Sequence, residues 1–419
     1  MMGFFKSIVD SFGILNMTPQ QGIMIIVALF FLYLSVAKKI EPLLLLGLAF
    51  GMLIANLPSS VTMGVDLSSL PENLRNAANA APLSSYYVNP VSGNPGLLNI
   101  IYKGIKLVVF PPMIFLCIGS ITDFGPLIAS PKSFLIGLGA QFGIFVAMGV
   151  SYMAGKYLSP YIPGLEEFKI WECAAIGIIG GADGPTAVYT SIMLAPKLLP
   201  AISIAAFSYM ALVPFIQPPF MRLLTTKKER VIVMPEPKAV TQSQKIMFPI
   251  ILAIVVLLLI PAAGALIAML CLGNLIKESG AVPRIAKALE GDFLSIVTLF
   301  VGFSIGSSAT AEIFLTFQTI IILLCGVIAF AFGTVGGIVI AKILNVLTGG
   351  KVNPLIGNAG VSAMPMAARI SQKMGIKYNP DNYLLMHAMG PLVSGVIGSA
   401  ICSGIFITYF VPIMNMASK

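Results

Sequence analysis

The sequence contains few charged residues for its length. Of 419 residues, 25 are Lys or Arg and 16 are Asp or Glu, so charged side chains make up 10% of the chain. An ordinary soluble domain has about 25%. Hydrophobic residues make up 57% of the chain, which leaves too little polar surface to cover a water-facing globule. The sequence therefore predicts an integral membrane protein.

Histidine and cysteine are too sparse for several common chemistries. His387 is the single histidine, which argues against imidazole-rich metal sites and against Ser/His/Asp hydrolysis in its usual form. The five cysteines lie far apart in apolar stretches and form no Cys-x-x-Cys pair, so we interpret them as buried free thiols. They are Cys117, Cys173, Cys271, Cys325 and Cys402.

The net charge of +9 does not indicate nucleic acid as a partner. The basic residues are scattered between apolar runs and form no Lys/Arg face of the kind that neutralises phosphates. Short loops rich in Lys and Arg stay in the cytoplasm. Residues 222–245 contain six basic residues and two acidic ones, so this segment is predicted to lie inside.

Apolar runs divide the chain into two membrane halves, residues 1–221 and 246–419, joined by the basic cytoplasmic linker 222–245. Several runs are shorter than the roughly 20 residues that cross a bilayer as a straight helix. Residues 58–100 are rich in Ser, Asn and Pro and are predicted to form a loop outside the hydrocarbon. The runs are 17–37, 42–57, 107–129, 133–155, 173–195, 199–221, 246–260, 262–276, 293–311, 313–341, 352–368 and 383–412.

The run 173–195 is predicted to be a re-entrant hairpin. If it crossed the membrane, the next run would deliver the basic linker to the wrong face. Its centre reads Gly-Gly-Ala-Asp-Gly-Pro-Thr from Gly180 to Thr186, and no continuous helix favours three glycines and a proline around one acid. Broken backbone at membrane depth is tolerated only where it is buried in protein or lines a water-filled cavity.

The second half repeats the first. Shifting the sequence by 180 residues matches five of the 17 positions from 177 to 193, where chance would give about one or two. Each half then has five spans and one hairpin, and the odd number of spans inverts the second half. The predicted fold is all-α, with about ten transmembrane helices and two re-entrant hairpins, the second at about 352–372. Such inverted repeats with discontinuous helices are typical of secondary ion transporters.

Asp183 is the only charged residue between Glu172 and Lys197. A carboxylate at mid-bilayer costs about 2.5 to 3.5 kcal/mol on insertion scales, so it normally marks an ion or proton site. The alternative is a helix cap for the N–H groups freed at the break. A sodium ion takes several oxygen ligands, which unwound backbone and Asn or Ser side chains supply. If the two breaks face each other, Asp183, Asn353 and Ser362 share one ion, although Asn353 is equally well explained as a loop residue before proline.

Two more residues have functional interpretations with simpler alternatives. Arg369 lies at the cytoplasmic end of the second hairpin and is either an interfacial anchor, which composition favours, or a clamp for a carboxylate. Tyr209 lies inside an apolar run, where a phenol is a candidate proton donor but packing is the better explanation. His387 and Glu312 receive no role.

Six long motifs together resemble a known family. They lie at 180–187 (Gly-Gly-Ala-Asp-Gly-Pro-Thr-Ala), 208–219 (Ser-Tyr-Met-Ala-Leu-Val-Pro, then Gln-Pro-Pro), 271–274 (Cys-Leu-Gly-Asn), 353–357 (Asn-Pro-Leu-Ile-Gly), 360–369 (Gly-Val-Ser-Ala-Met-Pro-Met-Ala-Ala-Arg) and 384–391 (Leu-Leu-Met-His-Ala-Met-Gly-Pro). In these motifs the chain closely resembles the beta subunit of the biotin-dependent, sodium-pumping decarboxylases. That family includes the membrane subunits of the oxaloacetate, methylmalonyl-CoA and glutaconyl-CoA decarboxylases.

The resemblance implies an enzyme that decarboxylates carboxybiotin carried by a partner and exports Na⁺ while consuming a proton. Its cofactors would be Na⁺ and biotin. Its partners would be a biotin-carrying subunit or domain, a carboxyltransferase alpha subunit and a small single-span gamma or delta membrane subunit, in the lipid bilayer of a prokaryotic inner membrane. Homo-oligomerisation is left open. The rival from another class is a secondary sodium/carboxylate symporter or Na⁺/H⁺ antiporter without an enzymatic role.

The resemblance also implies roles for individual residues. Asp183, Asn353 and Ser362 would bind sodium, and Gly357 would be the required turn of that site. Tyr209 would be linked to sodium or proton transfer.

Arg369 would contact carboxybiotin and, with Asp183 and Tyr209, would complete the catalytic set. The chain departs from the family in having Leu392 where Asn often follows the Gly-Pro of the last motif. Residues 58–97 resemble a lineage-specific loop with no assigned role.

Overall fold

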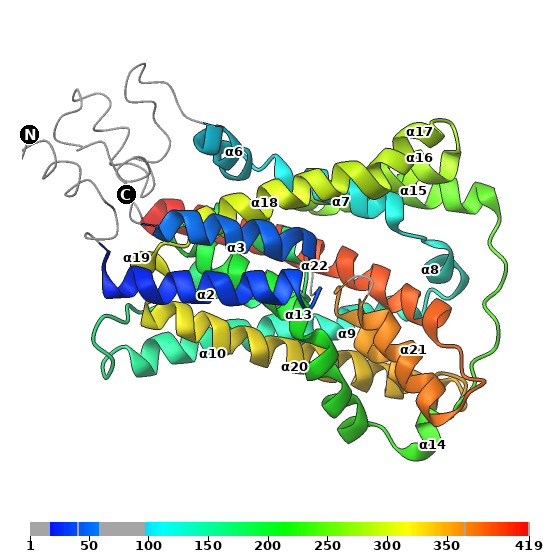
Figure 1. Cartoon of the computed structure of the whole chain (residues 1–419). Helices are drawn as coiled ribbons and strands as arrows, with labels where there is room; N and C mark the ends of the chain where they lie inside the picture. Colours follow the sequence, from blue (N-terminus) through cyan, green and yellow to red (C-terminus); the bar gives the residue numbers. More distant parts are fainter. Residues whose placement is uncertain (1–16, 40–41, 58–96, 364–365, 418–419) are drawn as a thin grey trace, which may run out of the picture. The chain divides into compact units, whose positions relative to one another are not determined.

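The computed structural model describes residues 17–39, 42–57, 97–363 and 366–417, and the regular structure in these ranges is entirely helical (Figure 1). Seven of the described helices are long and apolar enough to cross a membrane, and there are eight if the bent pair Pro196–Tyr209 and Leu212–Leu224 counts as one span. The predicted all-α membrane fold class is confirmed. Of the predicted loop 58–100, residues 58–96 lie outside the described residues, and residues 97–100 are helical instead.

The ten runs predicted to cross the membrane are helical over most of their length. Two of them, Pro42–Asn56 and Phe110–Ile121, are apolar helices shorter than the length expected of a span. The number of crossings and the inverted relation between the halves stay predictions. The described chain forms two compact units, which are treated separately below.

The first unit comprises the chain up to Phe110 together with 295–316. Its described helices are α2 (Pro19–Val36), α3 (Pro42–Asn56), α6 (Leu97–Lys106), α18 (Leu294–Ser308, of which the first residue belongs to the second unit) and α19 (Ala311–Phe314).

Within this unit α3 and α18 cross at close range. A Cβ on Gly306 would lie 1.9 Å from the carbonyl oxygen of Leu48, so this crossing requires glycine, as close helix pairs in membranes often do. At the end of α3 the buried Asn56 side chain donates from Nδ2 to the Ala309 carbonyl and accepts at Oδ1 from the Ala311 amide, both at 2.8 Å. One amide thus satisfies both backbone groups at the turn between α18 and α19.

The second unit comprises 111–294 and 317–419, and the first residue of its first helix, Phe110, belongs to the first unit. Its helices are α7 (Phe110–Ile121), α8 (Gly125–Ala129), α9 (Ser133–Ala140), α10 (Phe142–Leu158), α11 (Ile170–Gly177), η4 (Ile178–Gly181), α12 (Gly184–Leu194), η5 (Pro196–Leu198), α13 (Leu199–Leu224), α14 (Lys227–Arg230), α15 (Gln242–Leu259), η6 (Pro261–Ala263), α16 (Gly264–Ser279), α17 (Pro283–Ala288), η7 (Leu289–Phe293), α20 (Phe317–Leu347), η8 (Pro354–Gly360), α21 (Met366–Tyr378) and α22 (Leu385–Ala417).

The long helices α20 and α22 hold the centre of this unit. Helix α20 packs against α13, α10 and α9, and α22 packs against α9 and α12. Both also contact the 3₁₀ helices η4 and η8, which lie within the two segments that the sequence predicts to be broken. The two broken segments are therefore packed against the same pair of helices.

Helix α15 shows the outward-facing side of the unit. It begins after Thr241, whose hydroxyl accepts from the Gln244 amide while the Gln244 side chain accepts from the Thr241 amide, a capping box. Of its 18 residues only Pro249 and Val256 are buried. Such an apolar and exposed helix is suited to a lipid environment.

Candidate functional site

The first broken segment has the interruption that its glycines and proline predict. Helix α11 runs into η4, which ends where the Ala182 amide donates to the Ile179 carbonyl at 2.9 Å. Ala182 takes a left-handed conformation with φ of 56°, and Asp183 is extended before α12 begins at Gly184. A non-glycine residue in the left-handed region costs about 1 to 2 kcal/mol, so the surrounding packing must hold this turn.

The break places the Asp183 carboxylate in the protein interior, where the residue is 4% exposed. Its Oδ2 accepts from the Thr186 hydroxyl at 2.6 Å and from the Ser399 hydroxyl at 3.0 Å. Hydrogen bonds of this kind stabilise the charged carboxylate. Asp183 also stands at the N-cap position of α12, but its side chain makes no capping hydrogen bond there, so the structure does not support the helix-cap alternative.

Gln141, between α9 and α10, adds an oxygen near the break. Its Nε2 donates to the carbonyls of Gly137 and Gly395, at 3.1 and 3.2 Å. Its buried Oε1 has no hydrogen-bond partner in the described part of the chain and lies 3.6 Å from where a Cβ on Gly181 would stand. A buried acceptor left unpaired costs about 1 to 3 kcal/mol, which a cation or a water molecule at this position would remove.

The second broken segment contacts the first directly. The amide of Ser362 donates to the Gly181 carbonyl at 3.1 Å, and its hydroxyl donates to the same oxygen. Ser362 follows η8, while Gly181 ends η4 two residues before Asp183. The structure therefore brings Ser362 to the backbone beside Asp183.

Gly357 lies at a tight contact between η8 and α20. A Cβ on Gly357 would stand 2.5 Å from the Gly337 carbonyl oxygen, and a Cβ on Gly337 would stand 2.1 Å from the Gly357 oxygen. Gly357 is not among the described glycines with positive φ. Its requirement for glycine thus comes from close backbone packing and not from a left-handed turn.

Asn353 lies at the opposite end of η8 from Ser362. Its Oδ1 accepts from the Leu355 amide at 3.0 Å, and its Nδ2 donates to the carbonyls of Arg230 and Ile232 at 3.1 and 2.8 Å. Seven residues of 3₁₀ helix at about 2.0 Å each span roughly 14 Å. The structure does not bring Asn353 together with Asp183 and Ser362; its side chain caps η8 and holds the linker.

Arg230 completes this attachment of the linker. Its buried guanidinium donates to the Tyr378 hydroxyl and to the Thr225 hydroxyl, both at 2.8 Å, and to backbone carbonyls of 222 and 225. It also lies over the Tyr378 ring, 4.8 Å from the centroid. The start of the linker is thereby fixed to α21, the helix that follows the second break.

Tyr209 is buried on α13 against α20. Its hydroxyl donates to the Leu323 carbonyl, and its ring lies 5.7 Å from that of Phe330. A Cβ on Gly326 would stand 2.1 Å from the ring. The structure shows Tyr209 packed and hydrogen-bonded to α20 and records no bond between it and Asp183 among the described residues.

Of the two remaining residues that the sequence singles out, one is exposed and the other is buried. Arg369 is exposed on α21 and has no ion pair or hydrogen bond to another described residue. Its guanidinium is free to bind a carboxylate. Leu392 is completely buried on α22, where its role is packing.

Sequence reasoning missed a buried amide network beside η8. Gln217 and Asn358 exchange two hydrogen bonds, at 2.9 and 3.0 Å, and the Ser371 hydroxyl donates to Asn358. This network links α13, η8 and α21. Gln217 belongs to the Gln-Pro-Pro motif, so a polar residue within an apolar run was the available signal.

Comparison with known proteins gives one consistent result. A family model described as Na⁺-transporting oxaloacetate decarboxylase beta subunit matches residues 20–410. The chain is 45% identical to oxaloacetate decarboxylase beta chain 2 of Salmonella typhi, covering 97% of this chain and 99% of the relative. It is 46% identical to the methylmalonyl-CoA decarboxylase subunit beta of Propionigenium modestum, covering 96% and 97%, and 46% identical to that of Veillonella parvula, covering 95% of each.

Proposed function

Because this chain belongs to the family of beta subunits of Na⁺-transporting decarboxylases, we propose that it decarboxylates carboxybiotin on a partner and couples this reaction to Na⁺ export. The family confirms the resemblance inferred from the motifs and makes the protein a membrane subunit of a sodium-pumping decarboxylase. Relatives acting on two different substrates share this type of subunit. We infer that another subunit selects the acid.

The observation that carries the proposal is the buried Asp183 carboxylate at the meeting of two broken helices. One break holds the acid and the Thr186 hydroxyl, α22 supplies the Ser399 hydroxyl, and the other break contacts the first through Ser362 and the Gly181 carbonyl. A carboxylate surrounded by hydroxyl, carbonyl and amide oxygens suits a hard monovalent cation. We propose that Asp183 and Ser362 belong to the sodium site and that Gln141, with its unpaired Oε1, contributes to it.

The proposed coupling follows from charge. Loss of CO₂ breaks a nitrogen–carbon bond and leaves the electron pair on the ureido nitrogen, which takes up a proton. If that proton passes through Asp183, sodium release and proton consumption are linked, because a protonated Asp183 no longer holds a cation. Each Na⁺ exported against 100 mV costs about 2.3 kcal/mol, which decarboxylation supplies. Tyr209 is retained as a second candidate in proton transfer.

The remaining assignments concern carboxybiotin and the other subunits. The exposed Arg369 guanidinium offers paired donors for a carboxylate. A beta subunit works within a complex, and we propose that its partners are a biotin carrier, a carboxyltransferase alpha subunit and a small gamma or delta membrane subunit. Asn353 and Gly357 enter the proposal as residues that position η8.

The coupling is tested with Asp183→Asn in the purified complex reconstituted into vesicles. We expect loss of both CO₂ release and sodium uptake. Glu172→Gln is the matched control, since Glu172 accepts from the Lys169 amide at the start of α11 and should keep both activities. An Asp183→Asn variant that decarboxylates at the wild-type rate contradicts the coupling.

The rival symporter or antiporter is tested separately. Avidin resin should retain the chain from mild detergent extracts through a biotinylated partner, and avidin should block sodium uptake driven by decarboxylation. Sodium uptake that is insensitive to avidin and needs no biotinylated partner would favour the rival.

A further inference from the structure

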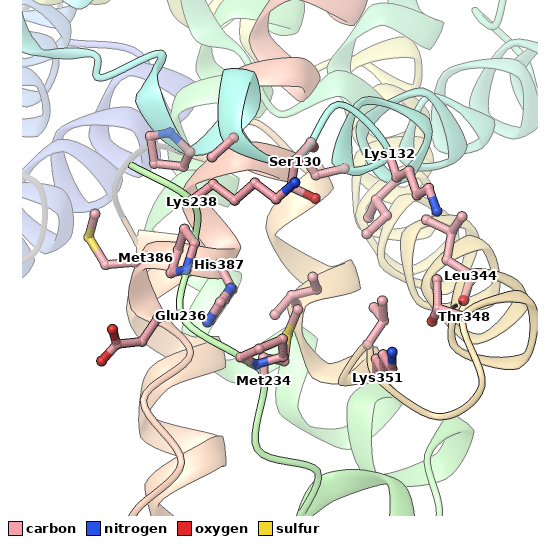
Figure 2. A pocket seen from close by; sticks show the side chains of 18 residues that line it. Ser130, Lys132, Met234, Glu236, Lys238, Leu344, Thr348, Lys351, Met386 and His387 are labelled. Atoms are coloured by element: carbon pink, nitrogen blue, oxygen red, sulfur yellow. Dashed lines mark hydrogen bonds between the residues drawn. The ribbon is translucent and has the colours of Figure 1, made fainter. Parts of the chain in front are cut away.

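A cavity of about 280 Å³ lies in the second unit beneath the linker residues 234–238. Its walls come from the turn between α8 and α9, the end of α20, η8 and the first turn of α22. Figure 2 shows the linker segment running across it, with His387 of α22 directed toward the same space. The basic linker thus forms one wall of a cavity that is large enough for a small ligand, in addition to indicating the orientation of the chain.

The rim of the cavity is basic. Three lysines line it (Lys132, Lys238 and Lys351) against one acid, Glu236, whose carboxylate is directed away from the lysines (Figure 2). None of the three lysines has an ion-pair partner among the residues that the structure describes. By contrast, Lys245, Lys277 and Lys342 of the same unit each pair with a carboxylate.

The floor of the cavity is apolar. Ile136 and Ile356 line it, together with Leu344 and Met386. Unpaired ammonium groups above an apolar floor suit a ligand that combines a carboxylate with a small hydrophobic ring. Inorganic phosphate would leave the floor unused, and the volume lies just below the usual range for ligand sites, about 300 to 1,000 Å³.

The cavity also adjoins the segment that leads to the proposed sodium site. Ile356 belongs to η8, and Ser362, just beyond the far end of η8, binds the backbone beside Asp183. At the near end, Asn353 holds the linker at 230 and 232, a few residues before the linker crosses the cavity. A ligand seated here would touch both the linker and the helix that leads to the acid.

We propose that this cavity receives the carboxylated ring of the partner's biotin, with Lys238 and Lys351 binding the carboxylate and the apolar floor holding the ring. The inference rests on the proposed function and deepens it by locating the substrate. Arg369 is not among the residues lining the cavity, so it would act on the approaching partner and not on the seated ring. Lysine contacts stabilise the carboxylate before CO₂ leaves, and uniform binding of this kind lowers KM without raising kcat.

The test measures release of CO₂ from a radioactively carboxylated biotin carrier by the reconstituted complex, as a function of carrier concentration. For Lys238→Gln combined with Lys351→Gln we expect KM to rise about tenfold with kcat changed less than twofold. Lys228→Gln is the matched control because it removes one charge from an exposed position of the same linker. Lys238→Arg combined with Lys351→Arg should restore most of the affinity.

The possible results distinguish failure of the cavity assignment from failure of the proposed function. An unchanged KM in the double Gln variant, or an equal rise in the Lys228→Gln control, overturns the cavity assignment. Unchanged KM with reduced co-purification of anionic phospholipid would instead identify the occupant as a lipid headgroup. If the wild-type complex releases no CO₂ from the carboxylated carrier, the proposed function itself is rejected.

Discussion

The chemistry around Asp183 depends on neutral oxygens supplied by distant parts of the second unit. Thr186 lies one turn along α12, whereas Ser399 comes from α22 and Gln141 from the junction of α9 and α10. Hydroxyl hydrogen bonds stabilise the ionised carboxylate, and hydroxyl oxygens remain able to coordinate a cation. The same few side chains therefore set both the charge of the acid and the oxygen environment of an ion.

Removal of one hydroxyl tests this arrangement. Ser399→Ala should raise the sodium concentration for half-maximal decarboxylation by about tenfold, because a hydrogen bond to a charged group is worth about 1.5 to 3 kcal/mol. The maximal rate should change less. Ser403→Ala is the control, since Ser403 lies one turn further along α22 and hydrogen-bonds Thr190 at 2.6 Å. Equal sodium dependence in the two variants would show that Ser399 does not contribute to the sodium site.

Asn353 allows a sharper distinction between an ion ligand and a structural amide. Asn353→Asp would place a carboxylate against the carbonyl oxygens of 230 and 232, which now accept from Nδ2. We expect a lower Tm and faster proteolysis of the linker, with no gain in sodium affinity. In a direct ligand, the added charge would strengthen sodium binding instead, and that result would contradict the positioning role. Asn379→Asp is the control, because Asn379 makes one long bond of 3.5 Å to the linker.

The sequence is informative at the residue scale only where a local motif carries the chemistry. Asp183 stands out because it is one acid among glycines in an apolar run, and Ser362 lies in the segment that repeats it. Ser399 is 216 residues from Asp183, with no local pattern to connect them. The sequence groups Asn353 with the acid because Asn353 shares a segment with Ser362, but the length of η8 separates Asn353 from Asp183 in the structure.

At the scale of elements, η8 is held at both ends and along its side. Asn353 fixes its start to the linker, Ser362 fixes the following residues to the first break, and Gly357 packs against α20. Such a short helix has few internal hydrogen bonds of its own. Its position therefore depends on these contacts, and the Gly357 contact has no spare room.

Gly357→Ala should accordingly disturb η8. The added Cβ would meet backbone atoms of α20 at 2.5 Å, and overpacking of this kind typically costs about 1 to 3 kcal/mol. We expect a lower Tm in detergent and a reduced rate of CO₂ release. Gly149→Ala on α10 provides the control, because nothing lies within 4 Å of its added Cβ. An unchanged Tm for Gly357→Ala would show that η8 shifts freely.

Element boundaries were predicted well where glycine and proline interrupt apolar runs and less well where packing decides. The break at 182–183 follows from its Gly-Gly and Gly-Pro pairs. The predicted run 107–129 is instead divided between α7 and α8, and α18 ends at Ser308 before the short helix α19. These ends depend on tertiary contacts, such as the Asn56 bonds to 309 and 311, which an apolar pattern does not encode.

At the scale of the whole molecule, the few charged residues are distributed as a membrane protein requires. Apolar residues remain exposed along helices such as α15, which suits lipid contact, while basic residues collect in the linker 222–245. The positive-inside rule then sets the orientation, and with it the face at which carboxybiotin and the lysine cavity would meet. The proposed carboxybiotin site therefore requires the same orientation of this linker as the predicted topology.

Added cysteines test this orientation in intact cells. Four native cysteines are buried and Cys402 is half-buried, so reaction of the unmodified chain with a membrane-impermeant maleimide should be low. Tyr161→Cys is at a position 84% exposed, and the re-entrant hairpin 173–195 and the single span 199–221 that separate it from the cytoplasmic linker predict that it lies outside. It should be labelled in intact cells. Lys228→Cys should be labelled only after permeabilisation, since its linker is predicted to face the cytoplasm. Labelling of Lys228→Cys in intact cells would place the lysine-lined cavity on the face opposite to a cytoplasmic biotin carrier. This result would contradict both the predicted topology and the proposal that carboxybiotin binds in the cavity.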